Sequence, residues 1–596
     1  MNQENEYTKR FDWRTWSRLI GYVGRHRGKV TVMGAVMIFV AGIDVVQPFL
    51  TGWLVDKIII PGELGRLPAF MILFATLGLV QAFNIFLFIA LAGKVDMGIC
   101  YDIRKEGFAR LQQLSFSFFD RTSSGWIIAR LTSDAQKLGD VIAWSLIDIS
   151  WGLSYMAMMA VAMVVVNWKL ALVSLCVLPP LLAVSLWFQK RILAGYRNVR
   201  KENSRITGRF SEGINGARTS KTLVREEANN AEFSQMTHSM REHSVRTATL
   251  SSLFMPTVLT LGAVGTAMAL WQGGEAVLAG TGLTYGVLVS FVFATAGFFE
   301  PVIELSRVFA DLQYAQASAE RVLSLLDERP QIQDPQNPLD HEHPIQGDIQ
   351  FNHVDFRYGD GELILKDFNL HVKQGQTIAL VGETGSGKST IVNMACRFYE
   401  PSRGQILIDG QDYRQMSQHH LQSHLGYVLQ SPQLFGGSVR DNIRYGRLNA
   451  SNAEVEQAAQ TVGAHAFIQK LPEGYDTAVG RGGGKLSVGE KQLISFARAI
   501  LANPAIFVLD EATSSVDAET EERIRGAIAT VLEGRTSFLI AHRLSTVRRA
   551  HRILVLEKGV VIEEGTHEQL MARQGSYYSL YSRQFTQEFS ALRRGA

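Results

Sequence analysis

The sequence predicts an all-α membrane domain of six transmembrane helices, followed by a cytosolic α/β domain. Its 596 residues exceed the roughly 250–300 at which a single hydrophobic core stops growing. Only 19% of them are charged, whereas a soluble domain carries about 25%. Long apolar segments precede residue 328 and short β-prone segments follow it. We therefore expect domains at residues 1–328 and 348–596, joined by a linker at 329–347, with a helical tail at the C-terminus.

Six apolar segments account for the first domain. They lie at residues 30–54, 67–92, 141–166, 170–188, 253–271 and 285–299. A helix needs about 20 mainly apolar residues to cross a hydrocarbon core of roughly 30 Å. We interpret the shorter fourth and sixth segments as spans too, because polar positions that face a cavity interrupt an apolar run without ending the helix.

Basic residues predict the orientation of these spans. Lys and Arg concentrate before the first segment, between the second and third, and between the fourth and fifth. By the positive-inside rule, both termini and the second domain are then cytoplasmic. The two long basic connections are predicted to form helical hairpins whose turns, at residues 115–132 and 211–224, contact the cytoplasmic domain. Two fully solvated hairpins are the alternative.

Four polar side chains lie within or beside the apolar segments, namely Asp44, Asn84, Asp148 and Glu300. An unpaired polar group is costly in the bilayer and usually faces a cavity or a partner. These residues are therefore candidate substrate contacts. Hydrogen bonds between helices, or positions in water beyond the bilayer, explain them equally well.

Charge and cysteine content exclude several classes of protein. The net charge of +3 gives too weak a field to indicate nucleic acid as a partner. The three cysteines, Cys100, Cys176 and Cys396, lie far apart in the sequence. They form neither a disulfide framework nor a zinc-type motif.

The α/β domain is predicted to begin after a proline-rich linker. Four prolines fall between residues 328 and 347, and proline breaks regular structure. Beyond them, β-prone runs at 377–381, 505–509 and 536–540 alternate with helical segments. This alternation is typical of a buried, mainly parallel sheet.

The first of these runs leads into a phosphate-binding motif, the P-loop. The pattern G-x-x-x-x-G-K-[ST] between a strand and a helix is met by Gly382, Glu383, Thr384, Gly385, Ser386, Gly387, Lys388, Ser389 and Thr390. Backbone N–H groups of such a loop wrap around nucleotide phosphates. Lys388 would reach the β- and γ-phosphates, and Ser389 would bind Mg²⁺. A structural glycine-rich turn is the alternative.

Two carboxylates follow a later β-prone run. Asp510 and Glu511 come at the carboxyl end of the predicted strand, where α/β proteins bind ligands. Asp510 is expected to hold Mg²⁺, and Glu511 to polarise the water that attacks the phosphate. Such a pair alone often just caps the next helix. Together with Lys388, it indicates ATP hydrolysis.

Three further motifs complete an ordered set. They are Gln430 at the end of a β-prone run, Leu486-Ser487-Val488-Gly489-Glu490, and His542 after the run at 536–540. With the P-loop and the two carboxylates, this order resembles the ABC transporter superfamily over nearly the whole chain. In particular, the chain resembles a bacterial exporter-type (type IV) half-transporter of the multidrug and lipid exporter branch. The resemblance implies ATP and Mg²⁺ as cofactors.

The resemblance also implies roles for single residues. Tyr358 would stack on the adenine base, and Gln430 would contact Mg²⁺ or the attacking water. His542 would lie near the γ-phosphate and hold the water and Glu511 in place. Asp517 matches the loop that crosses between two nucleotide domains. Each residue also has a purely structural interpretation, such as a surface tyrosine or a buried histidine.

The signature segment departs from the family's Leu-Ser-Gly-Gly-Gln. Ser487 and Gly489 are retained, whereas Val488 and Glu490 replace a glycine and a glutamine. In the family this segment contacts ATP held by the opposite subunit, so the resemblance implies a dimer. An altered signature beside an intact Glu511 favours a heterodimer with a second half-transporter, and a homodimer is the alternative.

These implications predict ATP-driven export by alternating access. The expected substrate is an amphipathic small molecule, drug or lipid, because spans rich in Met, Phe and Ala offer adaptable apolar contacts. Import of a metal-chelating molecule on the same fold, and an ATP-gated channel or regulator, are the alternatives. The expected location is the inner membrane of a bacterial cell, as a multi-pass protein among membrane lipids.

Overall fold

The computed structural model describes residues 12–280, 282–340, 344–510, 518–540 and 547–582. The chain divides into two compact units. The first, here the membrane unit, comprises Met1–Leu114 and Thr122–Arg329. The second, here the nucleotide unit, comprises Ser115–Arg121 and Pro330–Ala596. The boundary after Arg329 coincides with the first proline of the proline-rich segment.

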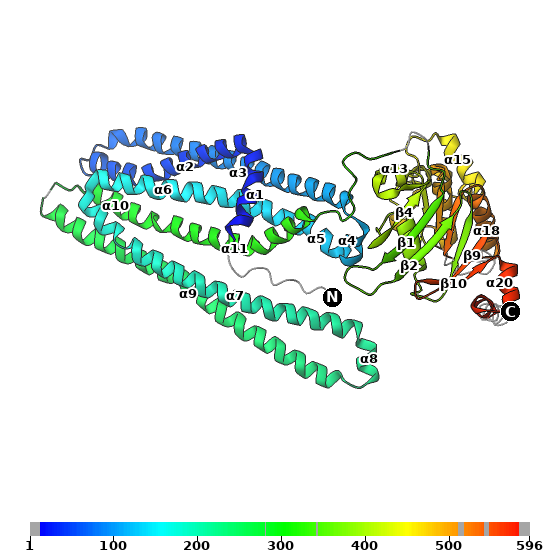
Figure 1. Ribbon diagram of the computed structural model, residues 1–596. Helices are drawn as coiled ribbons and strands as arrows, with labels where there is room; N and C mark the ends of the chain where they lie inside the picture. Colours follow the sequence, from blue (N-terminus) through cyan, green and yellow to red (C-terminus); the bar gives the residue numbers. More distant parts are fainter. Residues whose placement is uncertain (1–11, 281, 341–343, 511–517, 541–546, 583–596) are drawn as a thin grey trace. The chain divides into compact units, whose positions relative to one another are not determined.

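The described part of the membrane unit is helical throughout (Figure 1). Its α-helices are α1 (Trp13–Arg25), α2 (Arg27–Leu54), α3 (Leu67–Gln113), α5 (Ser124–Ala129), α6 (Ala135–Leu175), α7 (Leu178–Asn215), α8 (Ala217–Thr222), α9 (Glu226–Leu278), α10 (Tyr285–Gly297) and α11 (Phe299–Asp327). Several are far longer than the roughly 20 residues that cross a bilayer. Such helices extend beyond the membrane into water.

Five helical stretches are long and apolar enough to cross a membrane: Arg27–Ile59, Leu64–Gln113, Ser124–Leu175, Glu226–Leu278 and Tyr285–Asp327. They carry five of the six predicted spans. The fourth predicted span, residues 170–188, is divided between the end of α6 and the start of α7. Because α7 becomes polar and basic from Gln189 onward, no single apolar helix carries this span, and it stays a prediction.

Packing in the membrane unit centres on α6, which contacts α2, α3, α9 and α11, while α7 pairs with α9. Close approach of α2 and α10 depends on glycine, since a Cβ on Gly52 would lie 2.2 Å from the Gly286 carbonyl oxygen. Within α6, the backbone at Asn167 is extended (φ −159°, ψ 103°). Its side chain accepts a hydrogen bond from the Leu170 N–H at 3.1 Å. The bend therefore falls where one predicted span ends and the next begins.

The nucleotide unit contains two sheets. The smaller one has the order β2-β1-β4-β5, and the larger one β10-β9-β3-β8-β7-β6. The strands are β1 (Ile349–Phe356), β2 (Leu365–Val372), β3 (Thr377–Val381), β4 (Arg403–Ile408), β5 (Gln411–Asp412), β6 (Leu425–Val428), β7 (Ile506–Asp510), β8 (Thr536–Ile540), β9 (Arg552–Glu557) and β10 (Val560–Gly565). Among the described strands of the larger sheet, β9 and β10 pair antiparallel and the other neighbours pair parallel.

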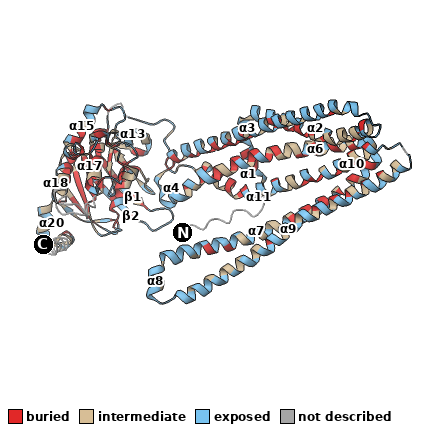
Figure 2. Ribbon diagram, turned by 180° about the vertical axis from the view of Figure 1, so that it is seen from behind, coloured by how far each residue is buried: buried red, intermediate tan, exposed pale blue. Residues whose placement is uncertain are grey.

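Helices surround the larger sheet. They are α12 (Lys388–Ala395), α13 (Gln418–Ser423), α14 (Val439–Arg444), α15 (Asn452–Thr461), α16 (His465–Ile468), α17 (Val488–Ala502), α18 (Ala518–Leu532) and α20 (His567–Arg573). Two hydrophobic clusters draw on alternate residues of its strands, such as Phe507 for one and Val508 for the other. The central strands are almost completely buried (Figure 2), as a parallel sheet covered on both faces requires.

Candidate nucleotide site and membrane cavity

Three of the predicted nucleotide-site motifs lie at one edge of the larger sheet. Strands β3, β8, β7 and β6 are parallel neighbours, so their carboxyl ends lie side by side. The P-loop follows β3, Asp510 ends β7, and Gln430 comes just after β6. Strand β8 ends at Ile540, which pairs with Asp510 in the ladder. Parallel α/β sheets bind ligands at this edge.

Glycines shape the P-loop between β3 and α12. Gly385 and Gly387 have φ values of 84° and 103°, a region that L side chains rarely adopt. A Cβ on Gly382 would lie 2.4 Å from the Leu556 carbonyl oxygen. Helix α12 begins directly after Gly387, so its positive end points at the loop and favours an anion. The backbone therefore has the form of a phosphate cradle.

The Lys388 ammonium group is held inside this loop. Its Nζ donates to the carbonyl oxygens of Gly382 at 2.8 Å and Glu383 at 2.7 Å. Burial lowers the pKa of this amine, while the Asp510 carboxylate raises it. A bound phosphate would offer a full negative charge in place of neutral carbonyl groups, which makes a stronger hydrogen bond.

Three oxygen donors suit a magnesium ion at this edge. Ser389 is an exposed residue of the first turn of α12, Asp510 ends β7, and Gln430 is exposed beyond β6. Hydroxyl, carboxylate and amide oxygens are hard ligands, and Mg²⁺ usually completes its shell with water and substrate phosphates. Across the described ranges, no group of three or more His, Cys, Asp or Glu side chains forms a separate metal site.

Tyr358 lies beside the helix that follows the P-loop. Its hydroxyl group is 3.3 Å from Thr390 Oγ1. Its ring packs edge-on against Phe356 and Tyr399, with centroids 4.8 Å away in both cases. The side chain is still 37% exposed. An aromatic face is thus available next to the phosphate cradle, as adenine stacking requires.

Three residues with predicted roles at the nucleotide site lie outside the described residues. They are Glu511, Asp517 and His542. Their roles in polarising water, in crossing to the second nucleotide domain and in contacting the γ-phosphate stay predictions.

The altered signature segment forms the start of α17. Ser487 is the N-cap residue, and its hydroxyl accepts a hydrogen bond from the Glu490 N–H at 3.3 Å. Glu490 Oε2 accepts from the Ser487 N–H at 2.8 Å, which completes a capping box. Val488 is 51% exposed, and Gly489 is buried. The substitutions preserve the start of the helix but place a carboxylate at its anion-binding end.

One segment that interrupts the membrane unit folds with the nucleotide unit. This is Ser115–Arg121, which contains α4 (Phe116–Arg121). Phe116 stacks on Phe398 with ring centroids 4.2 Å apart, and the Tyr399 hydroxyl donates to the Asp120 carboxylate. Burial and this carboxylate raise the pKa of Tyr399. The contact expected for the first hairpin turn is therefore present, whereas the second turn, at α8, belongs to the membrane unit.

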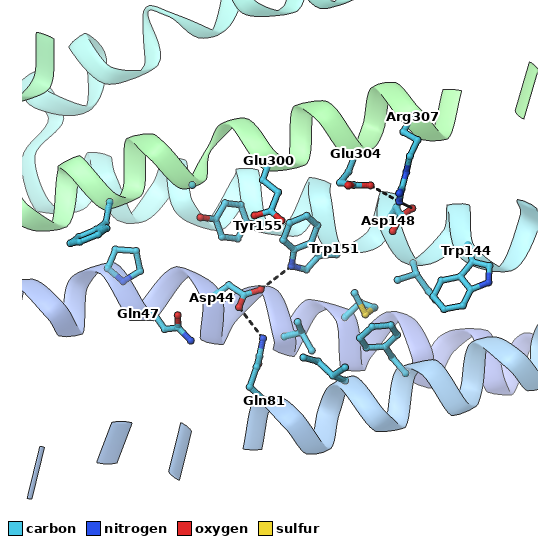
Figure 3. A pocket seen from close by; sticks show the side chains of 18 of the residues that line it. Asp44, Gln47, Gln81, Trp144, Asp148, Trp151, Tyr155, Glu300, Glu304 and Arg307 are labelled. Atoms are coloured by element: carbon cyan, nitrogen blue, oxygen red, sulfur yellow. Dashed lines mark hydrogen bonds and ion pairs between the residues drawn. The ribbon is translucent and has the colours of Figure 1, made fainter. Parts of the chain in front are cut away.

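The membrane unit contains a cavity of about 800 Å³ between α2, α3, α6, α10 and α11 (Figure 3). Residues three or four apart share a helix face, and the cavity-lining residues have this spacing. Helix α6 contributes Trp144, Asp148, Trp151 and Tyr155, and α11 contributes Glu300, Glu304 and Arg307. The wall is therefore aromatic and strongly acidic.

Three of the four predicted membrane contacts line this cavity. They are Asp44, Asp148 and Glu300. Asp44 accepts hydrogen bonds from Gln81 Nε2 at 2.8 Å and from Trp151 Nε1 at 2.9 Å (Figure 3). Both donors are neutral, so the charge of Asp44 is solvated without being neutralised.

Asp148 and Asn84 differ from Asp44 in the groups that they contact. Asp148 Oδ2 accepts from Arg307 Nη2 at 3.2 Å, and the same guanidinium pairs with Glu304 at 2.5 Å. Asn84 does not line the cavity. It is buried, and its amide donates to the Val80 carbonyl oxygen within α3 at 2.8 Å. A local backbone bond, rather than a ligand, satisfies this polar group.

Several residues of the cavity and of the α4 contact were not among the sequence predictions. In the cavity these are Gln81, Trp144, Trp151, Tyr155, Glu304 and Arg307, and beneath α4 they are Phe398 and Tyr399. A helical-face count starting from Asp148 would have found the α6 stripe, because its residues recur at intervals of three and four. No pattern near Phe398 indicated that it receives another segment.

Two family models match the chain where the two units lie. The ABC transporter transmembrane region matches residues 30–302, and the ABC transporter domain matches residues 365–514. The structure of a bacterial Atm1-family ABC exporter with ATP bound is similar to this one, with a TM-score of 0.76. It is 27% identical and covers 94% of this chain and 98% of its own.

Three similar proteins align with most of the chain. The uncharacterized ABC transporter ATP-binding protein YknV of Bacillus subtilis is 37% identical over 582 residues, 97% of this chain and 96% of its own. The ATP-dependent lipid A-core flippase of Desulfotalea psychrophila is 33% identical over 548 residues, with shares of 92% and 95%. The fatty acid ABC transporter ATP-binding/permease protein of Mycobacterium bovis is 36% identical over 471 residues, with shares of 79% and 74%.

Fold and site together define a multi-pass membrane protein with an ATP-binding domain of the P-loop type. The chain belongs to the ABC transporter family, as an exporter-type half-transporter. It is an ATPase coupled to transport across the membrane, and it works as a dimer with another ABC subunit.

Proposed function

We propose that this half-transporter exports amphipathic small molecules or lipids by alternating access, driven by hydrolysis of ATP with Mg²⁺. The cavity in the membrane unit carries the proposal. Its volume of about 800 Å³ lies within the roughly 300–1,000 Å³ typical of small-molecule sites. Both aromatic rings and polar groups line it, which suits a ligand with apolar and polar parts. ATP binding supplies the differential affinity that shifts the protein between two states.

The proposed setting is the inner membrane of a bacterial cell, with the nucleotide unit in the cytoplasm. The distribution of basic residues supports this orientation. Ser389, Asp510 and Gln430 are the proposed Mg²⁺ ligands, Lys388 holds the phosphates, and Tyr358 stacks on adenine. Glu511 polarises the attacking water, His542 orients it, and Asp517 crosses to the partner.

The proposed partner is a different half-transporter. Glu490 supports this, because its carboxylate sits at the N-terminus of α17, next to the place where ATP of the opposite subunit would bind. A negative charge there repels the γ-phosphate. A partner with an unaltered signature would complete the efficient site on the P-loop of this chain.

We expect Glu490→Gln to raise the ATPase rate of the transporter assembled with its partner subunit about two- to fivefold, the factor given by a charge worth about 0.3–1 kcal/mol at a helix end. Glutamine keeps the capping box, so α17 should stay intact. Glu454→Gln is the matched control, since Glu454 caps α15 in the same way. An unchanged or lower rate for Glu490→Gln would show that the carboxylate does not weaken the signature.

Assembly is tested with the chain expressed alone in lipid nanodiscs, by particle mass and ATPase rate. We expect either monomers or a dimer whose rate stays close to that of Glu511→Gln, which should bind ATP without turnover. A dimer that hydrolyses ATP far faster than this blank would contradict the heterodimer. Brisk hydrolysis by Glu511→Gln itself would contradict the role of that glutamate.

A further inference from the structure

The membrane cavity carries an unbalanced negative charge. Four carboxylates line it, and Arg307 is the only cation among the described lining residues. The Nη2 atom of Arg307 already contacts the carboxylates of both Asp148 and Glu304. Asp44 is held by two neutral donors. In the part of the chain that the structure describes, no side chain forms an ion pair or hydrogen bond with Glu300.

Aromatic groups surround these two unbalanced carboxylates. Figure 3 shows Asp44 and Glu300 projecting from α2 and α11 on either side of Trp151. Trp151 stacks on Tyr155, with ring centroids 5.5 Å apart. Tyr155 is only 6% exposed, yet its hydroxyl makes no hydrogen bond with any described residue. Tyr155 and Trp151 therefore form a pair of stacked rings in the cavity wall.

We propose that this cavity selects organic cations, namely amphipathic molecules with one positive charge next to aromatic or apolar groups. The inference rests on the proposed export function and specifies its substrate class. A cation between Asp44 and Glu300 relieves the cost of two charges in a membrane interior. It also gains cation–π attraction from Trp151, the ring type that binds cations best. An organic anion would add repulsion from both carboxylates.

The cavity therefore favours different molecules from those named for some relatives. The Mycobacterium bovis relative is called a fatty acid transporter, and a fatty acid is a carboxylate at neutral pH. Its headgroup would have to compete with Asp148 and Glu304 for Arg307. Chain length and apolar area would fit such a ligand, but charge opposes it.

The selectivity for cations is tested by comparing the binding of two probes that have nearly the same shape and opposite charge. Tetraphenylphosphonium and tetraphenylborate are measured by equilibrium dialysis with the full chain in nanodiscs, without nucleotide, and empty nanodiscs give the lipid background. We expect saturable binding of the cation at least about tenfold tighter than that of the anion. Equal affinity, or tighter binding of the anion, would overturn the proposal without reference to any variant.

Variants that remove a charge test whether tetraphenylphosphonium binds in the cavity. Asp44→Asn with Glu300→Gln should weaken tetraphenylphosphonium binding by about tenfold or more. Glu275→Gln should not change it, because Glu275 is exposed on α9 and lines no part of the cavity. Undiminished cation binding by the double variant would overturn the proposal.

Transport in inside-out vesicles separates this inference from the proposed function. Binding of the cation without ATP-driven movement of any probe would contradict export and leave the cation site standing. ATP-driven movement of tetraphenylborate but not of tetraphenylphosphonium would support export and overturn the cation site.

Discussion

Lys388→Ala should reduce ATP binding and abolish hydrolysis, lowering the ATPase rate about 100-fold or more. The buried amine now donates to two backbone carbonyl groups of the P-loop and would exchange them for phosphate oxygens. Hydrogen bonds to charged groups contribute about 1.5–3 kcal/mol each, so two such bonds account for an effect of this size. Binding of a fluorescent ATP analogue and phosphate release measure the two steps separately.

Two controls distinguish lost chemistry from a damaged loop. Lys388→Met keeps the aliphatic stem that is buried beneath the loop, and should be as inactive as Lys388→Ala. Lys373→Met removes an exposed lysine of the same unit and should retain the full rate. If Lys388→Met binds ATP as tightly as the unaltered protein, the ammonium group does not hold the phosphates.

The sequence predicts the nucleotide unit so well because local rules determine it. The P-loop needs glycine at Gly385 and Gly387, where φ is positive, and a strand and a helix on either side. Because the strands are parallel, Asp510 and Gln430 at their carboxyl ends must lie at the same edge as the P-loop. Asp510 and Gln430 reach this edge because β7 and β6 run parallel to β8 and to each other, which hydrophobic runs and connecting helices already indicate.

The membrane unit is harder to predict from the sequence, because hydropathy locates its helices but does not show which face of each helix points into the cavity. Asp44 and Asn84 look alike in the sequence as polar residues in apolar runs. Asp44 lines the cavity, whereas the Asn84 amide donates a hydrogen bond to the backbone of its own helix. The difference depends on the rotation of α2 and α3 about their axes, which helix packing decides. The same reasoning explains why Trp151 and Arg307 were overlooked.

Contacts between distant segments are the least predictable from sequence. The turn at Ser115–Arg121 could be expected to contact a cytoplasmic domain, but the receiving residues could not be named. Phe398 follows α12 and looks like an ordinary core residue of the nucleotide unit. Its stacking on Phe116 depends on a segment almost 300 residues earlier, and a single sequence holds no signal for such a pair.

Phe116→Ala combined with Asp120→Ala should abolish coupled transport while basal ATP hydrolysis persists. Helix α4 is joined by the chain to α3 on one side and α5 on the other, and its side chains pack on the nucleotide unit. We therefore expect α4 to link ATP hydrolysis to transport. An aromatic pair contributes about 0.5–1.5 kcal/mol and a hydrogen bond to a carboxylate about 1.5–3 kcal/mol. Losing about 2 kcal/mol or more should lower at least tenfold the fraction of molecules in which α4 is packed on Phe398 and Tyr399.

The measurement compares ATP-driven uptake of a fluorescent lipid or lipophilic cation into inside-out vesicles with phosphate release from the same preparation. The double variant should lose at least nine-tenths of the uptake and keep most of the basal hydrolysis, because Lys388 and the strand edge are untouched. Ser117→Ala is the matched control on α4, since the Ser117 hydroxyl makes no hydrogen bond with any residue that the structure describes. Tyr399→Phe removes only the donor to Asp120 and should give an intermediate loss. Parallel loss of uptake and hydrolysis in the double variant would mean that α4 supports the nucleotide site itself rather than transmitting its motion.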